Sequence, residues 1–70
     1  MDKNDNAKVQ RYLRRLFGNE TIRVTARPKL TDSAEIFIGE EFVGVLFEDN
    51  EDGDKSFNLQ MAILDTDLED

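Results

Sequence analysis

The sequence contains no cysteine, no histidine and no tryptophan, and it has one proline. Without cysteine, the fold has neither a disulfide nor a thiolate-bound metal to hold it together. Without histidine, it lacks the commonest zinc and copper ligand and the usual general base. Nucleophilic catalysis by a Ser-His or Cys-His pair is therefore excluded. We expect a protein that is not an enzyme and that carries no cofactor.

Long hydrophobic runs are also missing. The longest apolar stretches, such as MAIL at residues 61–64, are far too short to span a bilayer. The N-terminal residues MDKNDNAKVQ have no apolar run and do not resemble a signal peptide. These absences predict a soluble, cytoplasmic protein that does not interact with membranes.

The chain is small, and its 70 residues predict a single domain spanning residues 1–70. A domain of this size buries only about 60% of the surface that its unfolded chain exposes. Small domains therefore usually depend on a disulfide, a metal or a second subunit. With no disulfide available, the remaining sources of stability are a good core, oligomerisation or a cation held by oxygen ligands.

The charges are unevenly distributed along the chain, whose net charge is −7. Residues 1–29 carry a net charge of +5, and residues 30–70 carry −12. The simplest interpretation is that the two halves neutralise each other within the fold or across a dimer. The alternative is that the basic half binds an anion, although a pI near 4.4 lies far below the value of about 9 typical of nucleic-acid binders. The candidate anion-binding residues are Lys8, Arg11 and Arg15, spaced to share one flank of a helix, with Arg23 and Arg27 as further candidates.

The N-terminal region has the pattern of an amphipathic helix over about residues 5–17. Asp5 is the expected N-cap, with Asn4 and Asn6 as alternatives, because a short polar side chain can accept from the free N–H groups of the first turn. Gly18 is the expected residue after the helix, since glycine readily takes the positive φ found there. The apolar stripe recurs at helical spacing and consists of Val9, Tyr12, Leu13, Leu16 and Phe17.

Strands are predicted for the rest of the chain. Gly39-Glu40 has the sequence of a two-residue hairpin turn with glycine at its first central position. The final segment could instead be helical, which would give the α-β-β-β-α order of double-stranded RNA-binding domains, but it lacks the lysines with which those domains hold phosphates. The expected strands, assigned from alternating hydrophobicity and turn residues, cover about residues 21–27, 34–38, 41–48 and 55–64, with a frayed tail at 65–70.

The predicted fold class is therefore α+β, with one N-terminal helix packed on a four-stranded antiparallel meander sheet. The hairpin turn pairs Ile38 with Glu41 and Ile36 with Val43, and we expect Phe47 to lie opposite Phe57. This register places one apolar face beneath the helix, formed by Ala34, Ile36, Ile38, Val43, Val45 and Phe47.

The stretch EDNEDGDK at residues 48–55 partly matches a calcium-binding EF-hand loop. Glu48 replaces the expected first aspartate, and Leu59 stands where a bidentate carboxylate should complete the calcium shell. Both flanking segments are predicted to be strands rather than helices. We expect an acidic hairpin turn with no metal site, and weak Ca²⁺ or Mg²⁺ binding by residues 48–54 is a remote alternative.

The other sheet face is expected to be unusually apolar. The predicted register turns several large side chains away from the helix, whereas an exposed sheet face is normally polar. Such clusters often mark interaction sites, although the C-terminal tail could instead cover this one. The candidate interaction face consists of Phe37, Phe42, Leu46, Ala62 and Leu64.

Four stretches of the chain, VQRYLRRLFGN, IRVTARPK, DSAEIFIGEEFVGVLFEDNEDG and FNLQMAILDTDLE, resemble a small family of uncharacterised bacterial proteins of similar length. The resemblance covers nearly the whole chain. It implies a stand-alone cytoplasmic domain of unknown function and supplies no activity, ligand or site residue. The function we expect is a non-catalytic interaction module, homodimeric through the apolar sheet face, with another protein as the alternative partner.

Overall fold

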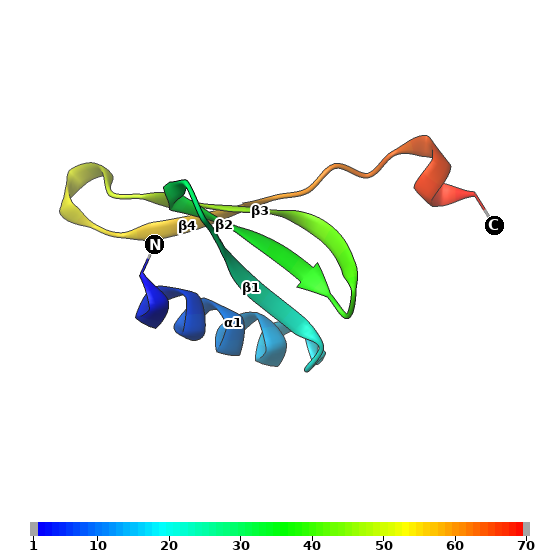
Figure 1. Ribbon diagram of the computed structural model, residues 1–70, viewed down its shortest axis with the longest axis horizontal. Helices are drawn as coiled ribbons and strands as arrows, with labels where there is room; N and C mark the ends of the chain where they lie inside the picture. Colours follow the sequence, from blue (N-terminus) through cyan, green and yellow to red (C-terminus); the bar gives the residue numbers. More distant parts are fainter. Residues whose placement is uncertain (1, 70) are drawn as a thin grey trace.

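The computed structural model describes residues 2–69 and confirms the α+β meander. One helix precedes four antiparallel strands that are hydrogen-bonded in chain order (Figure 1). The last strand is followed by an extended segment and a short 3₁₀ turn that lead away from the sheet (Figure 1). The elements are α1 (Lys3–Phe17), β1 (Ile22–Arg27), β2 (Leu30–Ile38), β3 (Glu41–Asp49), η1 (Glu51–Gly53), β4 (Ser56–Gln60) and η2 (Asp65–Leu68).

Helix α1 starts earlier than its apolar stripe predicted. Asp2 is the N-cap, and its carboxylate accepts a hydrogen bond of 2.7 Å from the N–H of Asp5. The prediction of Asp5 as N-cap is therefore wrong; Asp5 lies within the first turn, where its negative charge suits the helix dipole. The C-terminal prediction is confirmed, because Gly18 takes a φ of 62° and donates its N–H to the carbonyl of Arg14.

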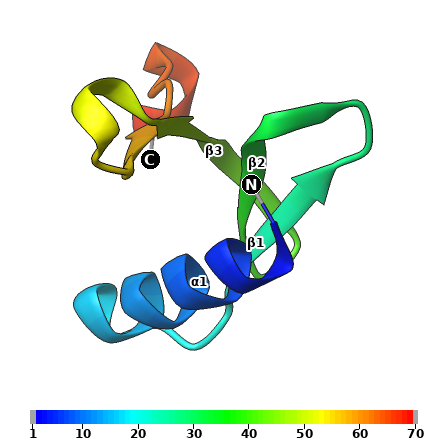
Figure 2. The ribbon, with the colours of Figure 1, turned by 90° about the vertical axis from the view of Figure 1, so that its left-hand side faces the viewer.

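The helix is attached to the edge strand β1. The side chain of Arg14 donates to the carbonyl of Ile22 at 2.8 Å, and that of Gln10 accepts from the N–H of Val24 at 3.0 Å. These bonds satisfy backbone groups that an edge strand otherwise exposes. They also hold α1 beside β1 (Figure 2), which lies at the opposite edge of the sheet from β4.

The strand boundaries also differ from the prediction. Strand β2 begins at Leu30 instead of residue 34, because the chain turns sharply at Pro28 and Lys29. Residues 56–60 form β4, so the helical alternative for this segment is wrong. The ladder between β3 and β4 ends at Gln60, earlier than the predicted residue 64.

A β-bulge in the central hairpin changes the predicted register. Ile38 pairs with Glu41 as expected, with Gly39 at a φ of 63°. The register then shifts, so Ile36 lies opposite Gly44 instead of Val43. A bulge inserts one extra residue into one strand and reverses the facing of the residues that follow.

The shift moves Leu46 into the core. Leu46 pairs with Ala34 on β2 and with Leu59 on β4, and only 2% of it is exposed. The predicted pair of Phe47 and Phe57 is also wrong, since Phe47 lies opposite Asn58. The core is small, and its buried hydrophobic residues are Leu13, Ile22, Ala34, Ile36 and Leu46.

Candidate interaction surface

Two of the predicted interaction residues, Phe37 and Phe42, form an aromatic pair on the sheet. Their rings meet edge to face, with centroids 5.7 Å apart. The guanidinium of Arg23 lies 5.1 Å from the centroid of Phe37 and donates to the carbonyl of Gly39 at 2.7 Å. Arg23 therefore partly covers Phe37, whereas Phe42 remains 51% exposed.

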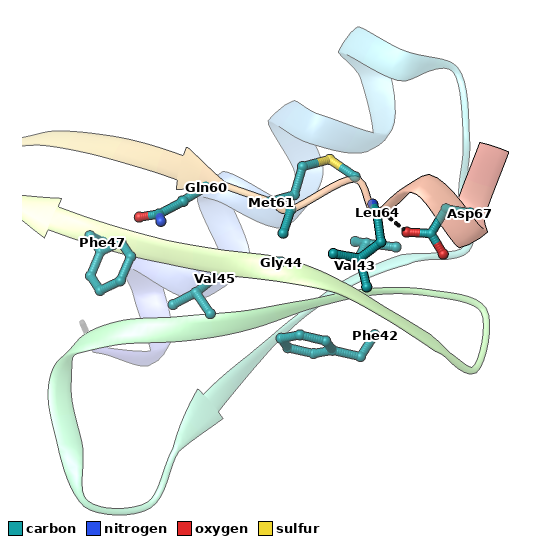
Figure 3. A pocket seen from close by; sticks show the side chains of 10 residues that line it. Phe42, Val43, Gly44, Val45, Phe47, Gln60, Met61, Leu64 and Asp67 are labelled. Carbon is teal, nitrogen blue, oxygen red and sulfur yellow. Dashed lines mark hydrogen bonds between the residues drawn. The ribbon is translucent and has the colours of Figure 1, made fainter.

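The predicted interaction face is incomplete, because Leu46 belongs to the core. Its other members still lie near one another. Phe42 lines a hollow of about 490 Å³ together with Ala62 and Leu64, which come from the extended segment after β4. In the view of Figure 3, the side chains of Phe42 and Leu64 lie on opposite sides of the β3 ribbon. The N–H of Leu64 donates to the carboxylate of Asp67 at 2.9 Å.

A second apolar surface lies between α1 and β4. This groove, about 290 Å³ in volume, is open because α1 is attached to β1 at the other edge of the sheet. A helix that covers the whole sheet face leaves no such groove, and the groove was therefore not predicted. No local signal could have revealed it, because the apolar stripe of α1 does not indicate which strands the helix covers. The groove is lined by Lys8, Val9, Tyr12, Leu13, Leu46, Phe57 and Leu59.

The five candidate anion-binding residues do not form one site. Lys8, Arg11 and Arg15 line a common hollow, and the guanidinium of Arg15 lies 5.7 Å from the centroid of Tyr12. Arg23 is engaged with Gly39 and Phe37, and Arg27 lies at the far end of β1. Anion binding therefore stays a prediction that involves the three helix residues.

The acidic stretch connects β3 and β4 as a turn. Gly53 has a φ of 80° at the end of the 3₁₀ turn η1. The N–H of Glu51 donates to the carboxylate of Asp49 at 2.9 Å, and the amide of Asn50 donates to that of Glu48 at 3.3 Å. Among the side chains that the structure describes, which do not include that of Asp52, no group of three acidic residues is suited to a metal ion.

Lys55 links this turn to the start of the helix. Its ammonium lies 3.0 Å from the carboxylate of Asp5 and 3.6 Å from that of Glu48. The hydrogen bond from Lys55 lowers the pKa of Asp5 below its usual value, and the nearby charge of Lys8 acts in the same direction. The same hydrogen bond raises the pKa of Lys55. The ion pair thus joins α1 to the residue preceding β4 at one end of the groove.

This contact predicts a specific pH dependence. Because the pKa of Asp5 is lowered in the folded state, the pair contributes stability above the unfolded value of about 3.9 and loses it as the pH falls through the folded value. NMR titration of the Asp5 carboxyl carbon should give a lower midpoint in the wild type than in Lys55→Gln. Lys29→Gln is the matched control and should leave the Asp5 midpoint unchanged. Equal midpoints in the wild type and in Lys55→Gln would contradict the contact.

Comparisons with known proteins identify the family to which the chain belongs. Among residues 2–69, there is no helix of the length and apolar character needed to cross a membrane. No curated protein and no solved structure matches the chain. A family model described as a protein of unknown function (DUF3126) matches residues 5–67, which is most of the chain, and the protein therefore belongs to the DUF3126 family.

Proposed function

We propose that this protein is a small, non-catalytic interaction module that functions as a homodimer, acting in the cytoplasm as a stand-alone bacterial domain. The non-catalytic part rests on the sequence, which offers neither an imidazole nor a thiol for catalysis. The homodimer rests on the amount of surface that a single copy leaves uncovered.

The accessible surface of the chain carries the proposal. A folded monomer of 8.1 kDa is expected to expose about 4,500 Å², whereas this chain exposes 5631 Å². The surplus of about 1,100 Å² is close to the roughly 800 Å² that each partner buries in a standard interface. An interface with a second copy would therefore bury an area of the same order as this surplus.

The composition of the exposed surface supports the same conclusion. Monomeric proteins rarely expose large contiguous apolar patches, and here the exposed large hydrophobic residues outnumber the buried ones. Phe42, Met61 and Leu64 lie around one hollow, and Tyr12 and Leu59 flank the α1–β4 groove. The α1–β4 groove and the segment after β4 are both exposed and can contact one partner at the same time.

Light scattering coupled to size exclusion tests the proposal directly. We expect the wild type to elute with twice the monomer mass of 8.1 kDa at micromolar concentration. Its melting temperature should rise with protein concentration, because association stabilises only the folded chain. A monomeric mass and a melting temperature independent of concentration would contradict homodimerisation.

A further inference from the structure

The segment from Ser56 to Leu64, SFNLQMAIL, contains no charged residue, although 36% of the chain is charged. Its first five residues form β4, which is one edge of the sheet, and the others continue beyond the end of the ladder. Exposed edge strands usually carry lysine, proline or a bulge that prevents pairing with another chain. This segment has neither lysine nor proline, so its open edge is suited to pairing.

The other edge of the sheet is protected along the first half of β1. Gln10 and Arg14 of α1 bond to the outward-facing backbone groups of β1. In the part of the chain that the structure describes, β4 is therefore the edge left open to a partner strand. Two copies that pair through this edge form a closed dimer, because the other edge of each copy is partly blocked by α1, which hinders the growth of a fibre.

We infer that two copies of this chain pair antiparallel through residues 56–64, about a two-fold axis at Gln60, and so form one continuous eight-stranded sheet. This inference rests on the homodimer proposed above and identifies its interface. Residues 61–64 then gain a partner strand, which explains why the alternating pattern of the sequence continues to Ile63 although the pairing with β3 ends at Gln60.

The proposed axis keeps the side chains of each face together. Phe57 and Leu59 point into the α1–β4 groove, so strand alternation places Met61 and Ile63 on the same face. An axis at Gln60 sets Phe57 opposite Ile63 and Leu59 opposite Met61 of the second copy, giving apolar pairs on this face. On the other face, Asn58 lies opposite Ala62, and the two Gln60 side chains face each other.

The backbone orientation agrees with this register. A Cβ atom on Gly44 of β3 would lie 2.5 Å from the carbonyl oxygen of Gln60, so this carbonyl points toward β3. Along a strand, the N–H and C=O groups of successive residues point to opposite sides, so the N–H and C=O of Leu59 and of Met61 face the open edge. They can form the hydrogen-bonded pair between copies, and the two Gln60 residues then form a non-hydrogen-bonded pair with Cα atoms about 4.5 Å apart.

A charge placed within this edge tests the inference. Ile63 is 64% exposed and lies beyond the β3–β4 ladder, so Ile63→Lys should fold normally but convert the dimer to a monomer by light scattering. Leu68→Lys is the matched control, since Leu68 is 68% exposed and lies outside the uncharged run, and it should remain dimeric. Phe42→Asp, on the aromatic pair, should also remain dimeric.

Cysteine cross-linking tests the position of the two-fold axis. The chain has no native cysteine, so only the introduced thiols can form a disulfide. Gln60→Cys should form a covalent dimer with oxidised glutathione as the oxidant, because the expected Cα separation lies within disulfide range. Asn58→Cys alone should not cross-link, whereas a mixture of Asn58→Cys and Ala62→Cys should give the mixed dimer.

The outcomes separate this inference from the proposed function. A monomeric wild type overturns both. A dimeric wild type in which Ile63→Lys stays dimeric, or in which Gln60→Cys does not cross-link, overturns the β4 interface and leaves homodimerisation standing. Loss of the dimer in Phe42→Asp but not in Ile63→Lys assigns the interface to the aromatic pair and likewise overturns the inference.

Discussion

Replacing Leu46 with alanine is expected to lower the free energy of unfolding by about 3 kcal/mol, because a buried leucine loses both its transfer energy and its packing. Leu46 is 2% exposed and belongs to the same cluster as Leu13, Ile22 and Ile36. A 70-residue domain is typically stable by about 4–10 kcal/mol. The loss would therefore remove a large fraction of the total and leave a measurable unfolded population.

The comparison with Phe42→Ala makes this prediction specific to the register. Phe42 is 51% exposed, so its truncation should cost about 1 kcal/mol, mostly from the lost contact with Phe37. Urea unfolding of both variants, at one fixed protein concentration, measures the difference. A larger cost for Phe42→Ala than for Leu46→Ala would indicate a hairpin without the bulge, in which Leu46 lies on the exposed face.

The helix, the strands and the turns were predictable because each has local causes. The helical stripe ends at Gly18, whose positive φ closes the last turn. Gly39 likewise sets the hairpin turn, and alternation identifies the first part of β4. These features depend on neighbouring residues, so the sequence carries them directly.

The register of β3 depends on long-range packing and was not predictable from the pattern. Residues 42–47, FVGVLF, are apolar at every position except Gly44, so both faces of the strand offer hydrophobic side chains. Alternation determines a register only where the two faces differ in polarity. The bulge that buries Leu46 instead of Val45 is therefore decided by the fit against Ile22, Ile36 and Leu13.

The position of the helix could not be predicted for a similar reason. The apolar stripe indicates which side of α1 is buried but not which strands it covers. The hydrogen bonds of Gln10 and Arg14 to β1 join residues that are 14 and 8 positions apart, and they hold the helix at the sheet edge. The open α1–β4 groove, and hence the candidate site, follows from these contacts.

Replacing Gly44 with alanine is expected to destabilise the protein by about 1–2 kcal/mol. The new Cβ would lie 2.5 Å from the carbonyl oxygen of Gln60 and 3.0 Å from the Cβ of Met61, so the backbone of β4 must move. Overpacking of this kind costs about 1–3 kcal/mol. The reduced freedom of the unfolded chain returns at most about 1 kcal/mol, so the steric cost prevails.

The displaced residues distinguish this effect from an ordinary glycine substitution. Gly53→Ala is the control. Its φ of 80° strains alanine, but no atom beyond the adjacent residues lies within 4 Å of the added Cβ. Amide shifts in a ¹⁵N NMR spectrum should therefore change only around the acidic turn. In Gly44→Ala the shifts should change at Gln60 and Met61. Because these residues also carry the inferred dimer edge, the dimer should weaken in the same variant. A stabilised Gly44→Ala protein with unchanged shifts at Gln60 would show that β4 does not approach β3 at this point, and the edge would then have a different register.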